Sequence, residues 1–136
     1  MYKRQEYVDE ENKTRWNFAT LEEVQQNVYS TTYNKSLIRF VKGKVEDTLQ
    51  EQDNLPAQIT VLRLDTDWFQ STKTELDVLF PRLVKGGYLI IDDYCTWGGS
   101  RAATDEWLKT HEAELCDVRS RTALMKHPEC FTAKKC

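Results

Sequence analysis

The sequence predicts an α/β fold with a mostly parallel sheet, and three observations lead to it. Short apolar runs alternate with helical patterns, which is typical of parallel strands joined by helices. The run at residues 88–91 is apolar without alternation, as expected of a strand covered on both faces. Acidic residues follow two of the runs, at the end of the strand where such folds bind their ligands.

The first half of the chain predicts one helix and two strands. Thr20 and Glu23 form a capping-box pattern, which marks the start of a helix. The expected elements are, in order, a helix from about Leu21, a strand over residues 37–41, a polar turn or short helix over 44–56 and a strand over 59–64.

The second half predicts two more helices, a third strand and a hairpin. Thr72 and Glu75 form another capping-box pattern, and Ser100 can cap the later helix. The first of these helices carries an apolar stripe, and Pro81 is expected to shorten its last turn. The stripe consists of Leu76, Leu79, Phe80 and Leu83. Gly86 and Gly87 are expected to close this helix before a strand over 88–91, and the hairpin strands are expected near 115–119 and 122–126.

Composition and charge exclude several functional classes. The 136 residues carry a net charge of −3, which argues against a nucleic acid or an anionic membrane as the main partner. We find neither a membrane-spanning apolar run nor a signal peptide. Four cysteines lack the spacing of a zinc site or a redox dithiol, so we expect ordinary thiols and a cytoplasmic protein.

Two successive strands are followed by acids, which are Asp65 with Asp67 and Asp92 with Asp93. If these strands pair in parallel, their ends lie roughly 5 Å apart and the carboxylates gather in a small volume. Like charges at that distance raise one another's pKa or require a cation. An all-oxygen set suits Mg²⁺, with Mn²⁺ or Ca²⁺ as alternatives. The alternative is that these acids only cap helices and turns.

Several blocks of the sequence resemble the macrocin O-methyltransferase family. Residues 40–49, Phe-Val-Lys-Gly-Lys-Val-Glu-Asp-Thr-Leu, and residues 62–72, Leu-Arg-Leu-Asp-Thr-Asp-Trp-Phe-Gln-Ser-Thr, are similar to two of its segments. The match continues in order through Pro81-Arg82-Leu83, Gly86-Gly87-Tyr88, Ile91-Asp92-Asp93-Tyr94, Trp97-Gly98, Arg101-Ala102 and Asp105. The resemblance covers roughly residues 20–126, and several blocks in one order make it specific.

The resemblance implies an enzyme that uses S-adenosylmethionine and a divalent metal such as Mg²⁺ to methylate a hydroxyl. The acceptor would be a small molecule, such as a sugar of a secondary metabolite. Metal ligands would be Asp65, Asp92 and Asp93, and Asp67 would be the general base. The metal would bind the acceptor oxygen and lower its pKa during an in-line methyl transfer.

The turn at Gly43 would border the adenine of the cofactor, with Glu46 or Asp47 contributing a hydrogen bond. The alternative is that Asp47 and Thr48 only cap a short helix. Trp68, Tyr94 and Trp97 would line an acceptor pocket, unless they serve packing.

The resemblance also implies a partial Rossmann-like class I methyltransferase fold. Its sheet order would be 3-2-1-4-5-7-6 with the last strand antiparallel, and strands 37–41 and 59–64 would be the third and fourth. We find no Gly-x-Gly pattern before the first helix, so the first two strands and the glycine-rich cofactor segment are expected to be missing, and the chain inactive alone. The strand 59–64 would then expose an edge open to self-association.

This predicts three regions. They are a polar segment over residues 1–19 that is artefactual or disordered, an incomplete methyltransferase domain over 20–127, and a tail over 128–136. Two other functions stay open, which are a non-enzymatic, degenerate metal-binding module and a Mg²⁺-dependent phosphoryl-transfer enzyme. The second is weakened because no phosphate-cradling loop accompanies Asp65 and Asp67.

Overall fold

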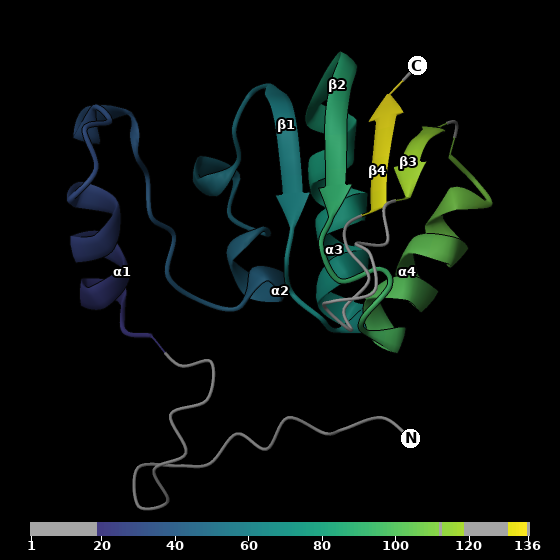
Figure 1. Cartoon of the computed structure of the whole chain (residues 1–136), viewed down its shortest axis with the longest axis horizontal. Helices are drawn as coiled ribbons and strands as arrows, with labels where there is room; N and C mark the ends of the chain where they lie inside the picture. The colour runs from purple at the N-terminus through teal and green to yellow at the C-terminus, as the bar shows by residue number, and fades with distance from the viewer. Residues whose placement is uncertain (1–18, 112, 119–130, 136) are drawn as a thin grey trace, which may run out of the picture. The chain divides into compact units, whose positions relative to one another are not determined.

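A four-stranded sheet organises the residues from Gly43 onward (Figure 1). The computed structural model describes residues 19–111, 113–118 and 131–135, the last two ranges by their backbone. The strands are β1 (Ile59–Leu64), β2 (Leu83–Ile91), β3 (Ala113–Val118) and β4 (Phe131–Lys135), in the order β1-β2-β4-β3. β1 is parallel to β2, and β4 is antiparallel to both of its neighbours. This is the 4-5-7-6 part of the predicted order and confirms the predicted fold class.

The chain divides into two compact units between Lys42 and Gly43. In the first, α1 (Leu21–Tyr29) begins at the predicted capping box. The Glu23 amide donates to the Thr20 hydroxyl at 3.1 Å, and the Thr20 amide donates to the Glu23 carboxylate at 2.8 Å. Neither α1 nor any other helix in the described ranges is long and apolar enough to cross a membrane.

The prediction of a strand over residues 37–41 is wrong. Lys35–Leu37 forms a 3₁₀ turn, and the residues after it are irregular. The Phe40 ring meets the Tyr29 ring edge-on, with 5.8 Å between centroids. A strand needs a neighbour to satisfy its amides and carbonyls, and no described residue pairs with this run as a strand. The short helix predicted over 44–56 is confirmed as α2 (Val45–Thr48), which a second 3₁₀ turn follows.

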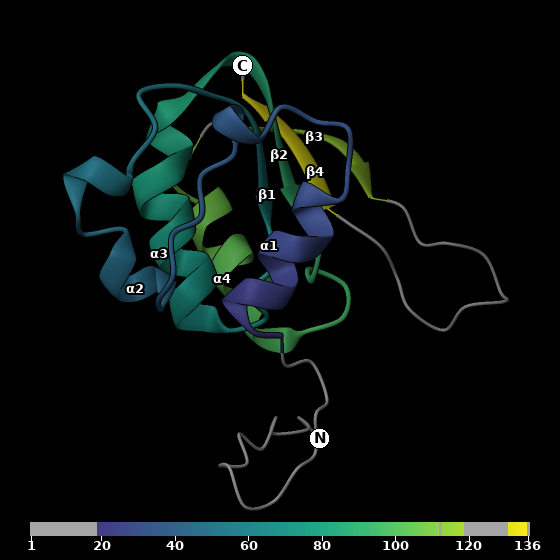
Figure 2. The ribbon, with the colours of Figure 1, turned by 90° about the vertical axis from the view of Figure 1, so that its left-hand side faces the viewer.

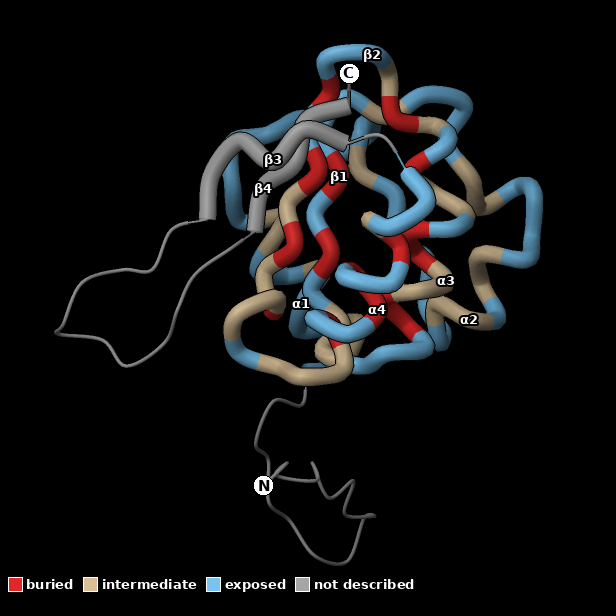
Figure 3. Tube along the Cα trace, turned by 90° about the vertical axis from the view of Figure 1, so that its right-hand side faces the viewer, coloured by how far each residue is buried: buried red, intermediate tan, exposed pale blue. Residues whose placement is uncertain are grey.

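Helices α3 (Phe69–Leu79) and α4 (Gly98–Leu108) cover one face of the sheet (Figures 1 and 2). Buried positions gather between these helices and the central strands (Figure 3). The core consists of Leu62, Leu64, Leu76, Phe80, Leu83, Leu89, Ile91 and Trp107. A 3₁₀ turn containing Pro81 ends α3, as predicted.

Both of these helices begin before their predicted caps. α3 starts at Phe69, so Thr72 lies inside it, buried and without a hydrogen-bond partner for its hydroxyl. α4 starts at Gly98, so Ser100 lies in its first turn rather than ahead of it. The N-cap residues are Trp68 and Trp97, and neither side chain makes a capping hydrogen bond. Position in the fold, rather than a local cap, therefore decides where these helices start.

β2 begins at Leu83, five residues before the predicted strand at 88–91. Its glycines do not close α3 but lie within the strand, where the pairing register shifts between Ile59 and Val61 of β1. Gly86 has φ 77°, and a Cβ on Gly87 would lie 2.9 Å from the Thr60 carbonyl oxygen. The glycine pair therefore allows a bulge against β1.

The hairpin prediction has a mixed outcome. β3 overlaps the strand expected near residues 115–119, whereas the strand expected near 122–126 lies outside the described residues. β4 lies in residues 128–136, which we expected to be a tail, and it pairs directly with β2. In the described sheet β1 is at the edge, as predicted, and Val61 on it is 57% exposed. Self-association through this edge stays a prediction.

Replacing Leu76 by alanine should destabilise the larger unit by about 2–5 kcal/mol, because a fully buried leucine leaves a cavity. Leu79→Ala in the same helix is the matched control and should cost less, because Leu79 is only partly buried. Urea unfolding followed by tryptophan fluorescence measures both. Equal losses would contradict the assignment of Leu76 to the centre of the core.

Candidate metal centre

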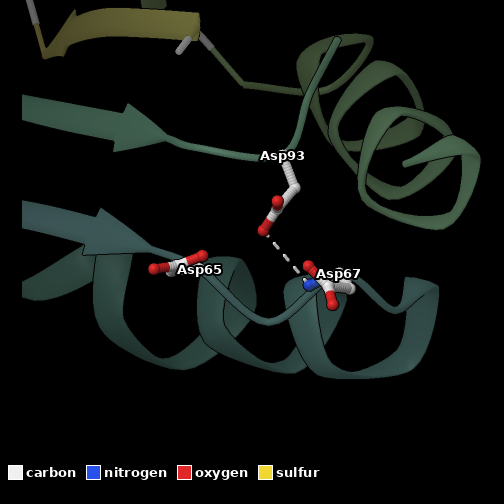
Figure 4. Close-up of side chains that lie close together, drawn as sticks. All are labelled: Asp65, Asp67 and Asp93. Carbon is white, nitrogen blue, oxygen red and sulfur yellow. Dashed lines mark hydrogen bonds between the residues drawn. The ribbon is translucent and has the colours of Figure 1, made fainter. Parts of the chain in front are cut away.

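Three carboxylates meet where β1 and β2 end. Asp65, Asp67 and Asp93 each offer an oxygen, and these oxygens lie within 4.8 Å of one another (Figure 4). Leu64 of β1 is paired with Ile91 of β2, so the residues that follow the two strands leave the sheet side by side. The gathering of acids that parallel pairing predicts is therefore present in the fold.

Backbone contacts hold Asp67 in an uncommon conformation. Its φ is 61°, in the left-handed region that asparagine and aspartate tolerate better than most residues. The Asp67 amide donates to the Asp93 carboxylate at 3.3 Å (Figure 4). The Asp67 carbonyl accepts from the Ser100 amide in the first turn of α4 at 3.1 Å. The chain around this carboxylate is thus tied to both β2 and α4.

The electrostatics of the cluster fit a bound cation. Burial and the neighbouring Asp67 raise the pKa of Asp93 to about 7. Burial also raises the pKa of Asp67, and the charges of Asp65 and Asp92 add to the effect. A hard divalent ion would relieve this repulsion, because carboxylate oxygens are the ligands that Mg²⁺, Mn²⁺ and Ca²⁺ prefer.

Asp92 differs from the prediction in its placement. Its carboxylate binds the Arg63 guanidinium at 2.6 Å, and its amide donates to the Leu64 carbonyl at 3.0 Å. β2 ends at Ile91, and Asp92 and Asp93 lie in the turn that follows, where the Asp92 carboxylate meets Arg63 and the Asp93 carboxylate meets the Asp67 amide. The three-acid group contains Asp67 in place of Asp92, and the role of Asp92 as a metal ligand stays a prediction.

Arg63, which the sequence did not assign to the site, lies among its acidic residues. Its guanidinium binds Asp65 at 2.8 Å as well as Asp92, and so connects the ends of β1 and β2. Partial burial opposes its charge, but the two carboxylates outweigh burial and raise the pKa of Arg63. The period of two along a strand was the available signal, because it places Arg63 and Asp65 on the same side.

The predicted cofactor residues lie around α2. Gly43 has φ 146°, and a Cβ there would lie 2.6 Å from the Thr48 methyl group, so the turn requires glycine. The Glu46 carboxylate accepts a hydrogen bond from the Ser71 hydroxyl of α3, which lowers the pKa of Glu46. Asp47 is exposed within α2 and does not cap it. Contact of these three residues with a cofactor stays a prediction.

The aromatic residues near the cluster differ in exposure. Trp68 is 50% exposed at the start of α3, and Trp97 is half-buried. The Tyr94 hydroxyl donates to Asp105 at 2.7 Å, and Arg101 lies over the Tyr94 ring while donating to its carbonyl. Tyr94, Arg101 and Asp105 all belong to the blocks that resemble the family, and their contacts hold the loop after β2 against α4. A pocket role for the aromatic residues stays a prediction.

A comparison with known proteins gives the identity of the family. The model of the family described as Macrocin-O-methyltransferase (TylF) matches residues 3–120. The chain belongs to this family. The match includes most of segment 1–19, and the division of the chain into three regions stays a prediction.

The curated relatives of this macrocin O-methyltransferase family member are O-methyltransferases by name. The chain is 36% identical to demethyldecarbamoylnovobiocin O-methyltransferase of Streptomyces niveus over 63% of its own length and 32% of the relative. It is 34% identical to mycinamicin III 3''-O-methyltransferase of Micromonospora griseorubida, over 68% of its length and 35% of the relative. The chain therefore spans about a third of these curated relatives.

Solved structures support the methyltransferase fold. The chain matches the O-methyltransferase NovP with a TM-score of 0.67 at 28% identity, over 85% of this chain and 45% of that one. It matches CalS11, a TDP-rhamnose 3'-O-methyltransferase, with a TM-score of 0.51 at 25% identity, over 69% and 39% of the two chains. These two matches and the sheet order agree on a partial Rossmann-like fold.

A further acid, Glu75 of α3, is buried and makes the stability of the protein depend on pH. Burial raises its pKa to about 7, although the Thr66 hydroxyl donates to its carboxylate at 2.8 Å. The folded state therefore keeps a proton that the unfolded chain releases above its ordinary value of 4.5. The associated stability is present below that value and is lost as the pH rises through about 7.

Replacing Glu75 by glutamine should stabilise the protein at pH 8 by up to about 3 kcal/mol and have little effect near pH 4.5. The amide keeps an oxygen that can accept the Thr66 bond but cannot ionise. Urea unfolding at several pH values measures the difference, with exposed Glu51→Gln as control. A stabilisation that does not change with pH would contradict the buried, protonated Glu75.

Proposed function

We propose that this chain is the metal-binding part of an S-adenosylmethionine-dependent O-methyltransferase that methylates a hydroxyl, on a sugar of a secondary metabolite. One observation carries the proposal, which is the convergence of Asp65, Asp67 and Asp93 at the carboxyl ends of neighbouring parallel strands. Ligands bind at this edge in α/β folds, and the family methylates oxygen.

The three converging acids are the proposed holders of a divalent cation such as Mg²⁺. When bound, the cation would supply Lewis-acid chemistry that lowers the pKa of the acceptor hydroxyl. A carboxylate of this cluster would take the hydroxyl proton, and the resemblance assigns that step to Asp67. The two roles of Asp67 compete, because a carboxylate bound to a cation is a weaker base.

The sugar acceptor is the finer part of the proposal and rests on the names of the relatives. CalS11 is named as a TDP-rhamnose 3'-O-methyltransferase, and two of the curated relatives are named for demethyldecarbamoylnovobiocin and mycinamicin III. The half-exposed Trp68 follows Asp67 directly and offers an aromatic face for a sugar ring beside the proposed centre. S-adenosylmethionine would supply the methyl group, with the α2 turn as its proposed border.

Calorimetric titration with Mg²⁺ should show binding that Asp93→Ala abolishes and Asp77→Ala preserves. Asp77 is a matched control, because it lies on α3 outside the cluster and pairs with Lys73 at 3.5 Å. Circular dichroism establishes that each variant is folded. Absence of Mg²⁺ and Mn²⁺ binding in the folded parent chain would overturn the metal centre.

The same titration with S-adenosylhomocysteine separates an enzyme from a non-enzymatic module. Binding of S-adenosylhomocysteine, the product formed from the cofactor, would indicate that the chain binds the cofactor as well as the metal, as an enzyme requires. A chain that binds metal but ignores S-adenosylhomocysteine would be a metal-binding module in isolation. Hydrolysis of a phosphate ester with Mg²⁺ would instead support the phosphoryl-transfer alternative, which the family match does not favour.

Asp92→Ala decides between the two ligand sets. If Asp65, Asp67 and Asp93 hold the cation, Asp92→Ala should retain binding, because Asp92 is not among the acids whose oxygens converge. If the set implied by the resemblance is correct, this variant should lose about as much affinity as Asp93→Ala. Asp67→Asn complements it, since a base that is not a ligand can be neutralised without loss of cation affinity.

A further inference from the structure

We propose that Gly99 is a positioning residue, which holds Asp67 in the metal centre by letting the first turn of α4 approach the Asp67 turn. The inference rests on the proposed function, because it concerns the geometry of the proposed cation site. Gly99 belongs neither to the acidic cluster nor to the predicted site residues.

The close approach is between backbones. A Cβ on Gly99 would lie 2.7 Å from the Phe69 amide nitrogen, 3.1 Å from the Asp67 carbonyl oxygen and 3.3 Å from the Trp68 carbonyl carbon. These atoms cannot swing away as the end of a flexible side chain can. Any larger residue at this position must therefore push α4 and the Asp67–Phe69 turn apart.

The contact sits at the point where the Asp67 conformation is fixed. The Ser100 amide, one residue further along α4, donates to the Asp67 carbonyl at 3.1 Å. The Asp67 residue it holds has φ 61°, an uncommon conformation for a residue with a side chain. Displacing the first turn of α4 would lengthen this bond and release the constraint that directs the Asp67 carboxylate toward Asp65 and Asp93.

Gly99 is needed for space rather than for backbone freedom. Its φ lies outside the left-handed region, unlike that of Gly43 and Gly86. It lies in the first turn of α4, and glycine is less favourable than alanine by about 1 kcal/mol in a helix interior and by less near the helix end. Helix propensity alone would therefore select alanine here. The effect of Gly99→Ala on cation binding and its effect on the intrinsic stability of the helix have opposite signs.

Terbium luminescence provides the test, because Tb³⁺ is a hard, oxygen-seeking ion whose lifetimes in H₂O and D₂O report its bound waters. We expect Gly99→Ala to bind Tb³⁺ about 10–100-fold more weakly than the parent chain, the range for loss of a supporting residue. Roughly one more water should be bound, as in Asp67→Ala, because water replaces the missing carboxylate. Gly98→Ala adds the same methyl group one position earlier, where it points in another direction, and should behave as the parent.

A double-variant cycle separates positioning from a general loss of structure. If Gly99 acts through Asp67, adding Gly99→Ala to Asp67→Ala should cause no further loss of affinity and no additional water. If Gly99→Ala does not fold, Ser100→Pro is the alternative variant. It removes the amide that donates to the Asp67 carbonyl, and it lies in the first turn of α4, where proline is tolerated. This variant should bind the same number of waters as Asp67→Ala.

The outcomes distinguish this inference from the proposed function. Parent-like affinity and hydration in Gly99→Ala, with a weakened Asp67→Ala, would overturn the positioning role and leave the metal centre intact. Additive losses in the double variant would also overturn it. If Asp67→Ala and Asp93→Ala both bind Tb³⁺ with the affinity and hydration of the parent chain, the metal centre and the role of Gly99 are both overturned.

Discussion

Repulsion among carboxylates at one end of the sheet is the constraint on which the local structure depends. Asp65, Asp67 and Asp93 converge there, and Asp92 directly follows the end of β2. On one side, the Arg63 guanidinium binds Asp65 and Asp92 and so offsets their charge. Around Asp67, the hydrogen bonds to Asp93 and Ser100 fix the backbone instead. The Arg63 guanidinium and two backbone hydrogen bonds therefore hold the acids in place, and they connect Arg63 with Asp92 and Asp67 with Asp93 and Ser100 across 26 or more residues of sequence.

Local patterns were sufficient for the elements with strong internal signals. The capping box at Thr20 and the apolar run of β1 needed no knowledge of the rest of the chain. The sheet order followed from the family resemblance, and the described strands agree with its 4-5-7-6 part. The gathering of acids followed from parallel pairing, but which of the acids converge depends on the turn after β2, in which Asp92 and Asp93 lie.

The failures share a physical cause, which is dependence on a distant partner. The run at residues 37–41 has the composition of a strand, yet Leu37 is 68% exposed, and no described strand pairs with it. Thr72 has the spacing of a cap, yet α3 starts three residues earlier, where the Asp67 turn meets α4. Gly99 was not recognised because its close neighbours, 30 or more residues earlier in the chain, are known only once the fold brings them together.

Asp65 contacts Arg63 and also belongs to the acidic cluster, so Arg63 affects the net charge of the proposed cation site. One carboxylate has two oxygens, so Asp65 can bind the guanidinium and still offer a ligand to a cation. Arg63 and a divalent ion together would neutralise three of the four carboxylates at this edge of the sheet. The negative charge that remains corresponds to one carboxylate able to take a proton from a hydroxyl. Without Arg63 a second carboxylate would stay uncompensated, and the repulsion that adds to burial in raising the pKa values of Asp67 and Asp93 would increase. The arginine of the Leu-Arg-Leu-Asp segment therefore belongs to the electrostatics of the site as much as to the packing of the sheet.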